Sequence, residues 1–147
     1  MRLWPLAILD QLPRQQLLGQ HRECCALRGK GWGRKHATVD YVFRHPYFYL
    51  FAYHKRVLDE MIRRGYSFAI EWGCSDYRGQ KLGDEHSAFT SWNHKTIEYL
   101  KRFEPVYPEH DVKYLDECIA NLAAKGVKID RNIALQKLED YAASNHS

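Results

Sequence analysis

Arg22 and Glu23, an adjacent cation and carboxylate, stand on an unusually bare face of an expected helix. At about 100° per residue, the face of helix Arg14–Gly29 that carries this pair consists of Gln15, Gly19, Arg22, Glu23 and Ala26. A solvated helix face is normally filled with long charged side chains, and a glycine there costs about 1 kcal/mol relative to alanine. The pattern predicts a surface that a bulky partner approaches closely. In the alternative interpretation, Gly19 and Ala26 pack beneath another segment and the charged pair is ordinary surface.

A basic, glycine-rich loop follows this helix. The segment Gly29–His36, GKGWGRKH, interleaves glycines with Lys30, Arg34 and Lys35. Exposed backbone N–H groups and cations could together hold a phosphate. The loop does not match the nucleotide-binding P-loop, which ends in glycine-lysine-serine/threonine. The alternative is a flexible basic loop without a ligand.

The histidines and cysteines form no recognisable metal or hydrolase motif. His86 and His110 each neighbour acidic residues, but neither has the spacing of a zinc site such as His-Glu-x-x-His. A nucleophile elbow is also absent. His54 falls within the apolar face of an expected helix, where a hydrogen-bonded core histidine is the alternative to a catalytic one. We therefore expect no metal and no cofactor.

Apolar spacing, prolines at helix starts and glycines at helix ends predict a mainly α-helical fold. The expected helices are Arg14–Gly29, Tyr47–Arg64, Ser91 or Asn93 to Phe103, a helix from Val112 that stops at Gly126, and Arg131–Ala143. The segment Ala37–Phe43 is expected to be an extended connection, and Tyr66–Gly83 a loop with a short turn of helix. Met1–Gln11 is expected to be a short apolar arm that crosses the helices near the first of them.

Length and composition fit one compact domain, residues 1–147. The net charge of +4 and the pI near 8.9 are compatible with a polyanionic partner but do not establish one. The four cysteines, Cys24, Cys25, Cys74 and Cys118, have no Cys-x-x-Cys spacing, and the apolar N-terminal patch is too short for a signal sequence or a membrane span. We expect a cytoplasmic protein with reduced thiols that does not bind membranes.

A family resemblance is carried by residues spread over the first part of the chain. They are Leu6, Leu12, Gln15, Leu17, Arg22, Glu23 and Gly29, then Arg34-Lys35-His36, Phe48, and the helix that contains His54 and ends with Arg64-Gly65. Aligned without gaps, this part resembles the small pyrimidine-dimer DNA glycosylases of the phage endonuclease V type, which are also AP lyases. The core that resembles this family covers about 1–65 and, more weakly, 104–129, whereas 66–103 is an extra segment and 131–143 a C-terminal helix.

The resemblance implies a mainly helical, metal-independent enzyme that flips a base out of double-stranded DNA. The family's nucleophile is the α-amino group of the mature N-terminus, whose pKa of about 7.7–8.0 leaves a useful neutral fraction near neutral pH, unlike lysine at about 10.4. Glu23 would stabilise the imine cation and transfer protons, and Arg22 would hold a DNA phosphate. Gln15, Arg28, Lys30, Arg34 and Lys35 would complete the DNA-binding set.

The position of the nucleophile depends on N-terminal processing. Methionine is usually retained before a residue as large as Arg2, so the expected nucleophile is the amine of Met1, or that of Arg2 if Met1 is removed. Trp72 and Trp92 are candidates for stacking on a lesion, with a core position as the alternative. We expect a monomer that acts on damaged or abasic DNA. The alternatives are a non-catalytic nucleic-acid-binding domain and a metal-dependent nuclease that uses His86 or His110.

Overall fold

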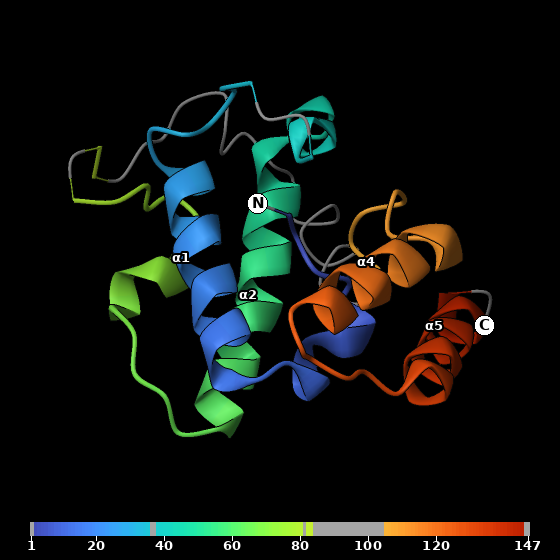
Figure 1. Cartoon of the computed structure of the whole chain (residues 1–147). Coiled ribbons are helices and arrows are strands. Elements are labelled where there is room, and N and C mark those ends of the chain that lie inside the picture. The colour runs from blue at the N-terminus through green and yellow to red at the C-terminus, as the bar shows by residue number, and fades with distance from the viewer. Residues whose placement is uncertain (1, 36–37, 81, 84–104, 146–147) are drawn as a thin grey trace.

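The computed structural model describes residues 2–35, 38–80, 82–83 and 105–145. These parts are mainly helical and contain no β-strand, which confirms the predicted fold class (Figure 1). The α-helices are α1 (Arg14–Arg28), α2 (Tyr47–Arg63), α4 (Val112–Ala124) and α5 (Arg131–Asn145). Short 3-10 helices lie between them, namely η1 (Leu6–Gln11), η2 (Asp40–Arg44) and η3 (Ile70–Gly73). The helix expected to end at Phe103 lies outside the described residues.

Helices α1 and α2 lie side by side at the centre of the fold (Figure 1). Pro13 precedes α1 and Pro46 precedes α2, because proline's fixed φ and missing N–H suit the start of a helix. The N–H of Gly29 donates to two carbonyl oxygens of the last turn of α1, at 3.0 and 3.2 Å. Gly65, with φ of 79°, follows α2 in the left-handed region that favours glycine. The predicted limits of both helices are confirmed to within one residue.

The apolar faces of α1 and α2 form much of the core. Leu17, Cys24 and Leu27 of α1 are buried with Leu50, Tyr53, Val57 and Leu58 of α2. Each fully buried aliphatic side chain of this kind contributes about 1.5–3 kcal/mol. Because this packing fixes the rotation of α1 about its axis, it also fixes where the Arg22 and Glu23 side chains emerge.

The N-terminal segment, residues 2–11, lies against α1, α2 and α4. Leu3 and the apolar residues of η1 are buried. The hydroxyl of Tyr53 donates to the carbonyl oxygen of Trp4 at 2.6 Å, and that of Tyr114 donates to the carbonyl oxygen of Leu3 at 2.8 Å. Residues 2–4 are therefore tied by their backbone to α2 on one side and to α4 on the other.

The connection between α1 and α2 differs from the sequence-based expectation. Ala37–Phe43 was expected to be extended, but η2 covers Asp40–Arg44 and buries Tyr41 and Val42. The Tyr41 ring packs edge-on against Tyr107 and His110, with ring centroids 5.5 Å apart in each case. Packing across the molecule thus outweighs the extended preference of these β-branched and aromatic residues. The short turn expected within Tyr66–Gly83 is confirmed as η3.

Two further features are the length and hydropathy of the helices and the state of the cysteines. None of the helices in the described ranges is both long and apolar enough to cross a bilayer. The four cysteines are free thiols, with Cys24 and Cys118 buried, Cys25 half-buried and Cys74 exposed.

Candidate active site

A cleft of about 640 Å³ opens between the N-terminal arm, α1 and α4. We call it the arm–α1 cleft. The arm contributes Arg2 and Trp4, α4 contributes Asn121, and Lys125 follows directly after α4. From α1 come four residues of the face that was predicted to be bare and approachable, namely Gln15, Gly19, Arg22 and Glu23. The structure therefore brings the charged pair and the start of the chain into one concave site.

The bare part of this face is open at Gly19. Among the described residues, a Cβ atom at Gly19 would meet only the end of the Arg22 side chain, Nη2, at 3.8 Å. No described segment therefore packs over Gly19. Ala26 is exposed, although its carbonyl oxygen accepts the N–H of Gly31 at 2.9 Å. The bare part of this face is therefore not buried, and at Gly19 it lines the cleft.

Gln20 attaches the arm to α1. Its Oε1 accepts the N–H of Trp4 at 2.5 Å, and its Nε2 donates to the carbonyl oxygen of Arg2 at 3.2 Å. Gln20 is 2 % exposed, and the Tyr53 hydroxyl lies 2.8 Å from the same Oε1. Sequence reasoning missed this residue. Its spacing between Leu17 and Cys24, which places it on the buried side of the helix, was the available signal.

The Arg2 side chain is held by α4. Its Nη1 donates to Cys118 Sγ at 3.9 Å, and its guanidinium carbon lies 5.8 Å from the centre of the Tyr114 ring. Together with the Gln20 contact, this fixes both the backbone and the side chain of Arg2 at the cleft. Met1, the other candidate for the reactive amine, lies outside the described residues.

The N-terminal half of the chain can also be compared with known proteins. Residues 1–73 match the family of pyrimidine dimer DNA glycosylases. The match confirms the family resemblance inferred from the sequence, and it covers the arm, α1 and α2. No curated protein and no solved structure matches the chain. Asn121 and Lys125, which form the α4 side of the cleft, lie beyond the region matched to the glycosylase family.

Most of the residues expected to bind DNA lie on the surface of this glycosylase-like region. Gln15, Arg22, Lys30, Arg34 and Lys35 are exposed. Within the basic loop, the N–H of Trp32 donates to Gly29 and that of Arg34 donates to Gly31, at 3.3 and 3.2 Å. These two amides serve turns of the loop and are not available for a phosphate, whereas its cations are exposed.

Arg28 was expected to bind DNA, and the structure instead places it in the interior. Its side chain is 0 % exposed. Nε donates to the Tyr47 hydroxyl at 2.9 Å, and Nη1 donates to His54 Nδ1 at 2.9 Å. The remaining donors reach main-chain carbonyl oxygens at 2.8–2.9 Å, those of Trp72, Cys74 and Tyr77. All five N–H groups of the guanidinium are thus used internally, and none can reach a DNA phosphate.

Trp72 belongs to this interior cluster. Its indole lies 5.0 Å from the Arg28 guanidinium carbon, and its ring packs edge-on against Tyr77 at 4.8 Å. It is half-buried and does not line the arm–α1 cleft. The core position that was the alternative for Trp72 therefore fits the structure. Trp92, the other stacking candidate, lies outside the described residues.

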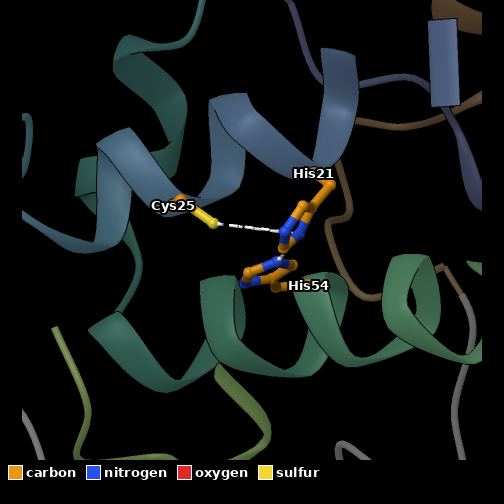
Figure 2. Close-up of side chains that lie close together, drawn as sticks. All are labelled: His21, Cys25 and His54. Atoms are coloured by element: carbon orange, nitrogen blue, oxygen red, sulfur yellow. Dashed lines mark hydrogen bonds between the residues drawn. The ribbon is translucent and has the colours of Figure 1, made fainter. Parts of the chain in front are cut away.

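His21, Cys25 and His54 form a separate cluster between α1 and α2 (Figure 2). Their potential metal-ligand atoms all lie within 4.8 Å of one another, and His21 Nδ1 is 2.9 Å from His54 Nε2. Arg28 can only donate, so His54 Nδ1 must accept and the His54 proton resides on Nε2, directed at His21. Because a metal would need that same Nε2 lone pair, the arrangement favours a hydrogen-bonded chain.

Burial reinforces this interpretation. Desolvation, and then the Arg28 charge, hold the pKa of His54 well below its usual 6.5. Burial also raises the pKa of the Cys25 thiol to about 12. A neutral imidazole and a protonated thiol pack well in a core, but the thiol would have to lose its proton to bind a metal.

The residues suggested for a metal-dependent nuclease are not gathered around His110. This histidine is 1 % exposed, its Nε2 lies 2.5 Å from the Tyr41 hydroxyl, and burial lowers its pKa to about 3. Of the neighbouring acids, Glu109 contacts His45 at 2.9 Å and Asp111 accepts the N–H of Tyr114 at the start of α4. His86 lies outside the described residues.

Proposed function

We propose that the protein is a DNA repair glycosylase and AP lyase that acts on double-stranded DNA containing a damaged pyrimidine or an abasic site. One observation carries the proposal. Within the region that matches the pyrimidine dimer DNA glycosylases, Arg22 and Glu23 share a cleft with the start of the chain. A terminal amine can act as nucleophile only where the chain's first residues enter the site, and Arg2 does so.

The proposed reaction begins at C1′ of the deoxyribose. The lone pair of the terminal amine forms a bond to C1′, and the bond to the base breaks, with its electron pair and a proton leaving on the base. The C1′–O4′ bond of the sugar then breaks as the nitrogen lone pair forms the C=N bond, O4′ keeps the electron pair and takes a proton from Glu23, and a protonated imine results. Removal of a C2′ proton breaks the C3′–O bond, and the phosphate leaves with that electron pair. On an abasic site the amine condenses with the aldehyde and releases water before the same elimination.

Glu23 is proposed to transfer the protons in these steps. It lines the cleft, and its Oε1 is buried. A carboxylate beside the imine stabilises the positive charge and can take the C2′ proton, and general acid–base catalysis of this kind contributes about 10²–10⁴-fold. Arg22, exposed on the same face, is proposed to bind a phosphate next to the lesion.

The proposed nucleophile is the amine of Met1. Gln20 binds the carbonyl oxygen of Arg2, and Cys118 of α4 binds its guanidinium. Arg2 would thereby hold the start of the chain at the cleft. If Met1 is removed, the amine of Arg2 takes its place. The intact mass of the purified protein, combined with the mass of the borohydride-reduced N-terminal peptide after digestion of a DNA adduct, identifies which amine reacts.

Borohydride trapping on duplex DNA with one abasic site tests the chemistry. We expect the native protein to form a reduced covalent adduct, and Glu23→Gln to cleave about 10²–10⁴-fold more slowly. Glu139→Gln, at an exposed position on α5, is the matched control and should retain the native rate. Absence of an adduct from the native protein, or undiminished cleavage by Glu23→Gln, would disprove the proposal. Salt-dependent DNA binding without an adduct would indicate the non-catalytic alternative.

A chelator separates the proposed route from a metal-dependent nuclease. In the Schiff-base route the terminal amine forms the electrophilic imine and Glu23 transfers the protons. Strand cleavage should therefore be the same with and without EDTA. Loss of cleavage in EDTA, restored by a divalent metal, would instead support the nuclease.

A further inference from the structure

The first residues of the arm form no regular secondary structure, yet their backbone is bonded to side chains from three different helices. Three consecutive carbonyl oxygens each accept one hydrogen bond, at 3.2, 2.8 and 2.6 Å: that of Arg2 from Gln20 of α1, that of Leu3 from Tyr114 of α4, and that of Trp4 from Tyr53 of α2. Buried carbonyl groups outside helices and sheets need such partners, because they have lost water. The start of the chain is therefore held at three successive points by α1, α2 and α4.

Tyr114 makes a second contact with the same segment. Its hydroxyl reaches Leu3, and its ring centre lies 5.8 Å from the guanidinium carbon of Arg2. The ring is itself restrained, because it stacks on His110 with centroids 4.8 Å apart and an interplanar angle of 10°, and packs edge-on against Tyr41 at 6.2 Å. A hydroxyl on a ring packed in this way donates from a fixed position. Tyr114 therefore orients both the backbone of Leu3 and the side chain of Arg2.

The contact from Tyr114 comes from outside the region matched to the glycosylase family. Gln20 and Tyr53, the partners of the arm on α1 and α2, lie within residues 1–73, whereas α4 follows them. Arg2 lines the arm–α1 cleft together with Glu23. A side chain that fixes Arg2 and its neighbour thus fixes one wall of the cleft.

We propose that Tyr114 is a positioning residue, which holds Leu3 and Arg2 so that the start of the chain stays at the arm–α1 cleft during the reaction. This inference rests on the proposed function, in which the terminal amine is the nucleophile. The rate of a reaction with a held nucleophile depends steeply on placement, and a displacement of about 1 Å can cost about 100-fold. Tyr114 does not line the cleft, so it acts through the two arm residues that it contacts.

The first test measures the arm by amide hydrogen exchange, without DNA. The N–H of Trp4 donates to Gln20 in a buried hydrogen bond, so it exchanges only when the arm detaches. Tyr114→Phe removes the hydroxyl and keeps the ring beside Arg2, and it should make this exchange about five- to tenfold faster, the effect of one lost hydrogen bond. Tyr107→Phe is the matched control, because this buried tyrosine belongs to the same aromatic cluster and its hydroxyl has no hydrogen-bond partner among the described residues. Equal exchange in the two variants would overturn the inference.

The second test separates positioning from substrate binding. At saturating abasic DNA, Tyr114→Phe should slow borohydride trapping about tenfold while the Kd for DNA stays the same, and Tyr107→Phe should trap at the native rate. Tyr114→Leu, which also removes the ring beside Arg2, should slow trapping further, and the melting temperature of each variant shows that it folds. A native trapping rate in Tyr114→Phe, or a weaker Kd with an unchanged saturating rate, would overturn the inference. A native protein that forms no adduct refutes the proposed function, whereas the exchange of Trp4 still decides whether Tyr114 holds the arm.

Discussion

Gln20 shows how one residue can position a site without taking part in its chemistry. It binds the backbone of both Arg2 and Trp4 and is itself buried. Gln20→Leu leaves a buried N–H and a buried carbonyl unpaired, so we expect a loss of about 1–3 kcal/mol in the free energy of unfolding. Because the arm is then less fixed, the trapping rate at saturating DNA should also fall. Gln80→Leu, at an exposed position, is the control, and an unchanged trapping rate in folded Gln20→Leu would argue against the positioning role.

Arg22 and Arg28, two arginines of α1, should respond to substitution in opposite ways. Arg28→Met leaves its buried acceptors without donors and should lower the free energy of unfolding by about 3–5 kcal/mol. Arg22→Ala should change stability little, because the side chain is exposed, and should weaken DNA binding. Chemical denaturation and DNA titration of the two variants measure both effects. A stable Arg28→Met with weakened DNA binding would restore the sequence-based role of Arg28.

The buried histidines predict a loss of stability in acid. Burial lowers the pKa of His54 well below 6.5 and that of His110 to about 3. The unfolded chain therefore binds protons below pH 6.5 that the folded protein does not. The contribution of the neutral histidines to the free energy of unfolding is fully present above this pH. As the pH decreases below it, this contribution is lost, by up to about 1.4 kcal/mol per pH unit for each histidine. Urea unfolding between roughly pH 6 and 5 measures the slope, which His110→Gln should reduce. A flat profile in the native protein would contradict the buried neutral state.

Site residues whose positions follow from local helical spacing could be predicted from the sequence. Those whose positions depend on contacts with distant segments could not. Helical spacing alone fixes which side chains share a face, so the grouping of Gln15, Gly19, Arg22 and Glu23 could be predicted. The buried position of Arg28 depends on carbonyl oxygens of the loop 72–77, which no local pattern places beside α1. A glutamine such as Gln20 is likewise ordinary in a helix until its partners in the arm are known.

At the scale of elements, the open middle of α1 links helix stability to function. Gly19→Ala should raise the free energy of unfolding by about 1 kcal/mol, since alanine is the better helix former and its Cβ meets only Arg22 Nη2 at 3.8 Å. If DNA approaches this face closely, the same methyl group should reduce trapping efficiency. Thermal melting and trapping kinetics test the two effects together. A stabilised variant with native kinetics would show that the substrate does not contact Gly19.

Elements with strong local signals were predictable, and those formed by distant packing were not. Prolines and glycines marked the ends of α1 and α2 to within one residue. The 3-10 helix η2 has no comparable signal, because Tyr41 is drawn inward by Tyr107 and His110, which lie more than sixty residues later in the chain. The α4 side of the cleft depends in the same way on the meeting of the arm with residues 112–125. For this reason the sequence indicated the α1 residues of the site but not Asn121.

At the scale of the whole molecule, the modest net charge of +4 leaves DNA affinity dependent on where the cations lie. Lys30 and Lys35 are exposed in the loop that follows the cleft-lining helix. Each phosphate contact adds close to one unit to the slope of log affinity against log salt, through release of counterions. Lys30→Gln and Lys35→Gln should each reduce that slope by about one and weaken binding to all DNA sequences alike. Lys128→Gln, an exposed lysine beyond the loop and the cleft, should leave the slope unchanged. Equal slopes in all three variants would place the DNA on another face of the molecule.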